Sequence, residues 1–62
     1  MSNDEKFNGM VLLVAKRNDA SAKAELALIK YGYDSREYDT SSAIEHIANS
    51  AVRDWRNLCN KG

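Results

Sequence analysis

The chain has 62 residues, and its nine Lys and Arg residues are balanced by nine Asp and Glu residues. This length allows one small domain, 1–62, and excludes a dinucleotide-binding α/β fold or a kinase lobe. The zero net charge is unlike the positive excess of a polybasic nucleic-acid binder, whereas the 44% apolar fraction is typical of a folded domain. The longest apolar run, residues 10–15, is shorter than a membrane span of about 20 residues, so we expect a cytoplasmic protein.

The first segment fits two kinds of secondary structure. Ser2 and Glu5 have the spacing of a capping box, and apolar residues follow at helical intervals, which predicts a helix over about 3–16. Gly9 is unfavourable inside a helix, and the apolar run that follows it also reads as a buried strand over 10–15. Periodicity does not decide between helix and strand for so short a run.

The second segment, about 20–31, is rich in strong helix formers. Asp19 is a candidate N-cap, with Ser21 as the alternative, and Gly32 suits the left-handed position just after the helix. Apolar side chains fall on two nearly opposite sides, which indicates a helix packed between two neighbours, with small alanines that allow close approach.

The third segment, 42–59, shows the clearest pattern. Ser42 and Glu45 predict a second capping box, and basic residues near the end suit the helix dipole. The apolar residues recur at steps of three and four, which predicts an amphipathic helix. We call this set the apolar stripe: Ile44, Ile47, Ala48, Ala51, Val52, Trp55, Leu58 and Cys59.

These segments predict an all-α domain of three helices, at about 3–16, 20–31 and 42–59. The alternative is a βαβα unit with strand 10–15 and a second strand near 36–38. Residues 32–39 resemble the segment that leads into the second strand of glutaredoxin-like proteins. Near residues 18–23, where that family has its Cys-x-x-Cys motif, this chain has no cysteine, so we assign none of the family's functional residues.

The sequence offers no catalytic, cofactor-binding or metal-binding group. His46 is the only histidine and lies on the polar side of the third segment, whereas Cys59 lies in the apolar stripe. One histidine and one cysteine do not complete a structural zinc site. We therefore expect no enzymatic activity, no cofactor and no metal.

The sequence does contain residues that are typical of protein-binding surfaces. The connection that we expect over residues 32–41, together with Tyr31 just before it, holds all three tyrosines among three acids and one base, which suggests a protein-binding surface. Its candidate residues are Tyr33, Asp34, Glu37, Tyr38 and Asp39. For self-association, the candidate residues come from the apolar stripe: Ile44, Ile47, Ala51, Trp55 and Leu58.

The sequence thus favours a small non-enzymatic regulatory or adaptor protein that binds an unidentified protein partner and forms a homodimer, a style common in phages and other mobile elements. The alternative is a dimeric nucleic-acid-binding regulator, because side chains that contact phosphates and base edges share one helical face. This face comprises His46, Asn49, Arg53 and Arg56.

Overall fold

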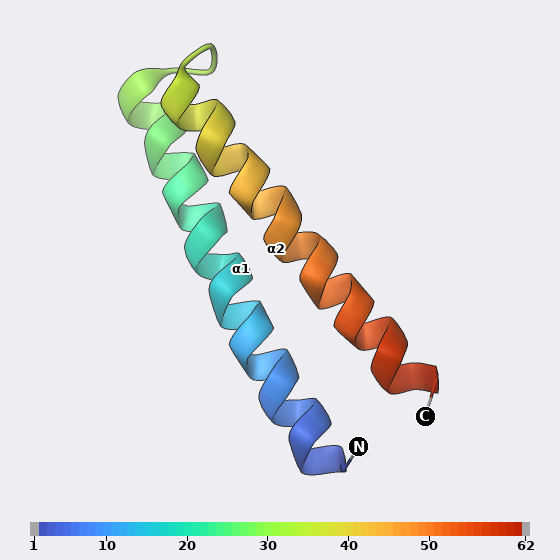
Figure 1. Cartoon of the computed structure of the whole chain (residues 1–62). Coiled ribbons are helices and arrows are strands. Elements are labelled where there is room, and N and C mark those ends of the chain that lie inside the picture. Colours follow the sequence, from blue (N-terminus) through green and yellow to red (C-terminus); the bar gives the residue numbers. More distant parts are fainter. Residues whose placement is uncertain (1, 62) are drawn as a thin grey trace.

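Two long antiparallel helices make up the computed structural model, which describes residues 2–61. Helix α1 runs from Asn3 to Tyr31 and helix α2 from Arg36 to Lys61, and a four-residue connection joins them. The helices lie side by side along their whole length, so both ends of the chain lie opposite the connection (Figure 1). The molecule is a helical hairpin about 43 Å long.

The prediction of three helices at 3–16, 20–31 and 42–59 is wrong, and so is the βαβα alternative with strand 10–15. The described residues contain no strand, and α1 continues through the expected break. Asp19 is not an N-cap: it lies inside α1, where its carboxylate pairs with Lys23 at 3.0 Å. The chain has no proline, so nothing in the sequence forces α1 to end near Arg17.

The start of α1 agrees with the sequence. The Ser2 side chain accepts a hydrogen bond from the Glu5 backbone at 3.2 Å, and the Glu5 carboxylate accepts one from the Ser2 backbone at 3.3 Å. The predicted capping box is therefore confirmed, and the helix that it starts continues through the 10–15 run. At the other end, Gly32 adopts a φ of 93° and its N–H donates to the Leu28 carbonyl, as a glycine C-cap does.

Helix α2 begins six residues before the predicted start. Ser35 caps it, because its hydroxyl oxygen accepts a hydrogen bond from the Tyr38 backbone at 3.1 Å. The same hydroxyl donates to the Gly32 carbonyl at 2.7 Å, which closes the turn. The predicted capping box at Ser42 and the ten-residue connection are therefore wrong: Ser42 lies within α2.

The two helices meet along a seam in which positions alternate by three and four residues. On α1 the seam comprises Met10, Leu13, Arg17, Ala20, Ala24 and Ala27. On α2 it comprises Tyr38, Ser41, Glu45, Ala48, Val52, Trp55 and Cys59. An average step of 3.5 residues is the spacing of coiled-coil packing. Among the described residues only three alanines and one valine are buried, so the core is thin: Ala20, Ala24, Ala27 and Val52.

Near the chain ends, Trp55 packs across a gap that Gly9 provides. A Cβ atom added at Gly9 would lie 2.7 Å from Trp55 Cε2 and closer still to Cζ2. The indole N–H donates a hydrogen bond to the Lys6 carbonyl at 3.1 Å, so the ring is held in place. The lack of a side chain at Gly9 thus leaves the space on α1 that the Trp55 ring occupies.

We expect Gly9→Ala to destabilise the hairpin, although the same change in an exposed helix stabilises it by about 1 kcal/mol. The added methyl group meets the Trp55 ring, and overpacking of this kind costs about 1–3 kcal/mol. Urea unfolding followed by far-ultraviolet circular dichroism measures the change. In a Trp55→Leu background the substitution should become stabilising, and the same gain in both backgrounds would contradict the packing argument.

Two serines test the boundary of α2. Ser35→Ala removes the N-cap acceptor and should lower the free energy of unfolding by about 1 kcal/mol. Ser42→Ala should leave stability unchanged or slightly raised, because alanine is favoured inside a helix. Thermal unfolding of both variants gives the comparison. A larger loss of stability for Ser42→Ala than for Ser35→Ala would indicate that α2 begins at residue 42.

Candidate functional site

A groove runs along one side of the seam between the two helices, and we call it the side groove. Its volume is about 470 Å³. Helix α2 contributes an apolar wall: Ile44, Ile47, Ala48 and Ala51. Helix α1 contributes a wall that is apolar at the base and charged at the rim: Leu13, Lys16, Asp19, Ala20 and Lys23. The groove therefore combines an apolar floor with lysines along one edge.

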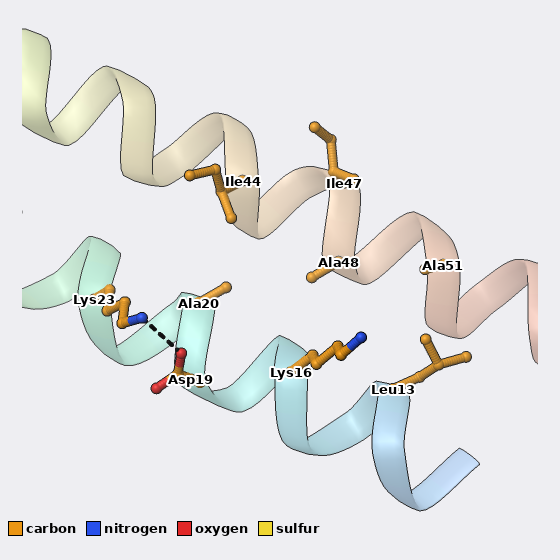
Figure 2. Close-up of a pocket in the computed structure, with 9 residues that line it drawn as sticks. All are labelled: Leu13, Lys16, Asp19, Ala20, Lys23, Ile44, Ile47, Ala48 and Ala51. Carbon is orange, nitrogen blue, oxygen red and sulfur yellow. Dashed lines mark ion pairs between the residues drawn. The ribbon is translucent and has the colours of Figure 1, made fainter. Parts of the chain in front are cut away.

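The α2 wall presents large apolar side chains to solvent. Ile44 is 53% exposed and Ile47 is 70% exposed. Figure 2 shows Ile47 pointing away from α1, whereas Ala48 faces it. Leu58, seven residues after Ala51 and hence on the same edge of α2, is also 53% exposed. A continuous apolar edge of α2 is thus left without a partner within the hairpin.

The structure divides the self-association residues inferred from the sequence. Ile44, Ile47, Ala51 and Leu58 lie together on the exposed edge of α2, whereas Trp55 turns toward α1 and packs at Gly9. Helix α1 can cover only part of the wide apolar stripe.

Helix α1 also has apolar side chains outside the seam. Leu26 is 65% exposed, and Ile29 and Phe7 are exposed as well. The sequence indicated two packed sides for residues 20–31, and α2 covers only the side that carries Ala24 and Ala27.

The tyrosine and acid residues gather at the closed end of the hairpin. Tyr33 and Tyr38 face each other with ring centroids 5.5 Å apart, and the Ser35 cap lies between them in sequence. Asp34 is exposed in the connection, while Glu37 and Asp39 belong to the first turn of α2, where acidic side chains suit the helix dipole. The tyrosine pair and these acids therefore contribute to the turn itself, and Tyr38 also lines a small hollow of about 190 Å³ together with Ala24 and Leu28 of α1.

The candidate nucleic-acid residues do share one surface. His46, Asn49, Arg53 and Arg56 are all exposed on α2, away from the seam. Asp54 lies beside them, and its carboxylate is 3.7 Å from Arg53 Nε, which partly neutralises the positive charge. The surface is small and mixed in charge.

Two general properties complete the description of residues 2–61. Neither helix is long and apolar enough to cross a membrane. Within the same residues, no three side chains of the metal-ligating types come together.

Comparison with known proteins gives no match: no protein-family model, no curated protein and no solved structure matches this chain. Among three hollows lined by residues 2–61, the side groove has the largest volume and the most apolar lining.

Proposed function

We propose that the chain acts by protein–protein binding, as a helical hairpin that pairs with a second copy of itself through the side groove. The observation that carries this proposal is the unpartnered apolar edge of α2, where Ile44, Ile47 and Leu58 are each more than half exposed. Four-helix bundles form when two hairpins cover such surfaces.

The exposed area of the hairpin supports a second copy as the occupant. A compact monomer of 7.0 kDa exposes about 4,000 Å² by the usual scaling with mass. This chain exposes 4818 Å², an excess of about 800 Å². One partner in a stable interface of standard size buries about 800 Å². The excess therefore matches what one dimer interface would cover.

The thin core supports the same conclusion. Only three alanines and one valine are buried among the described residues, so the seam supplies little hydrophobic stabilisation. Chains of fewer than about 70 residues usually need an added source of stability, and oligomerisation is one of these sources. In this dimer the acidic turn stays exposed for a further protein partner, which is how a regulatory or adaptor role would be exercised.

Sedimentation equilibrium over a concentration series tests the proposal. We expect the wild-type chain to sediment at twice its 7.0 kDa mass. Ile47→Glu should shift it to the monomer mass, because a charge buried in an apolar interface without a partner is strongly unfavourable. A wild-type chain that stays at 7.0 kDa at the highest concentration overturns the proposal.

Ile29→Glu is the matched control. Ile29 is 76% exposed, close to the 70% of Ile47, but it lies on α1 outside the side groove. This variant should dimerise as the wild type does. Circular dichroism of both variants establishes that they are folded, and an equal loss of dimer in both would show that the interface is not the side groove.

A further inference from the structure

The two-fold arrangement of the dimer can be inferred from the charges that border the side groove. This inference rests on the proposed function. Identical surfaces pair through a two-fold axis, and two hairpins meeting face to face allow two directions for that axis. An axis parallel to the helices places α1 of each copy over α2 of the other, with both turns at the same end. An axis across the helices places like helices over each other, with the turns at opposite ends.

The α1 edge of the groove is basic. Lys16 and Lys23 line it, and Lys30 follows at the same seven-residue interval, which places it on the same edge. Asp19 is the acid on this edge, and Lys23 pairs with it at 3.0 Å. No ion pair holds Lys16 within the described residues, although it borders the apolar wall of α2.

The α2 edge is apolar and carries two acids, Glu37 and Asp54, and the Asp54 carboxylate also lies 3.7 Å from Arg53 Nε. Asp54 borders a second hollow that shares Ile47 and Ala51 with the side groove, so it lies on the outer rim of the same apolar edge. Glu37 precedes Ile44 by seven residues and is exposed on this edge near the turn. Lys61, in the last turn, is the one basic residue of the row that contains Asp54.

These edges favour one arrangement over the other. With like helices paired, the lysine edge of α1 faces its own copy and the Asp54 edge of α2 does the same, so like charges meet. With unlike helices paired, Lys16 of one copy lies near Asp54 of the other, and Lys30 lies near Glu37. We propose that the hairpin dimerises with α1 over α2 of the second copy, so that both turns lie at the same end of a four-helix bundle.

Distances between spin labels test the arrangement directly. A single label at Asp34→Cys, in a Cys59→Ser background, marks the turn of each copy. With both turns at one end, neighbouring helices are about 10 Å apart and the labels should lie within roughly 30 Å. With the turns at opposite ends, the labels would be separated by about the 43 Å length of the hairpin.

The two proposals fail in different ways. A dimer with the long label distance overturns the same-end arrangement and leaves dimerisation through the side groove standing. If sedimentation equilibrium shows a monomer and no distance between two labels is detected, dimerisation is overturned and the arrangement fails with it. A dimer with the short label distance supports both dimerisation through the side groove and the same-end arrangement.

A charge exchange gives an independent test. Lys16→Glu and Asp54→Lys should each weaken dimerisation about tenfold, because two symmetric, exposed contacts change sign. The double variant should recover the wild-type dissociation constant. Both sites are exposed, so the variants should remain folded. Additive weakening in the double variant would overturn the pairing of Lys16 with Asp54 across the interface.

Discussion

A pair of helices can cover only one side of each member, and this constraint shapes the whole molecule. In this hairpin the covered sides form a seam whose buried residues are alanines and one valine. Larger apolar side chains, such as Ile44 and Ile47, stay beside the seam and in contact with solvent. The same limitation explains both the thin core and the apolar groove, because the residues that would thicken the core are the ones that α1 does not reach.

The sequence was sufficient to identify helices but insufficient to count them. The capping box at Ser2 and the C-cap at Gly32 were predicted and are present, because both depend on local hydrogen bonds. Asp19 and Ser42 are residue types that also cap helices, and each of them lies inside one. Helix α1 continues through Asp19, and the next residue, Ala20, is buried against α2, a tertiary contact that no local pattern reports. The true start of α2 had a sequence signal in Ser35, followed by acids in the first turn.

The sequence predicts which residues share the apolar side of α2, but it does not predict which of them face α1. Helical spacing places Ile44, Ile47, Ala51 and Leu58 on one side of α2, since residues three, four and seven apart share one side of a helix. It also placed Trp55 with them, because that side of α2 is broader than the strip that one neighbour covers. Which part of it meets α1 depends on how the two helices are rotated against each other, and in this arrangement Gly9 leaves room for the indole ring.

The position of Trp55 has a consequence for spectroscopy. It is the only tryptophan of the chain, and it is packed at the end where the termini lie, whereas all three tyrosines belong to the end of α1, the connection and the first turn of α2. Indole emission therefore reports fraying of the terminal end, and tyrosine signals report the closed end. The chain carries intrinsic probes that distinguish opening at its two ends, without any added fluorophore.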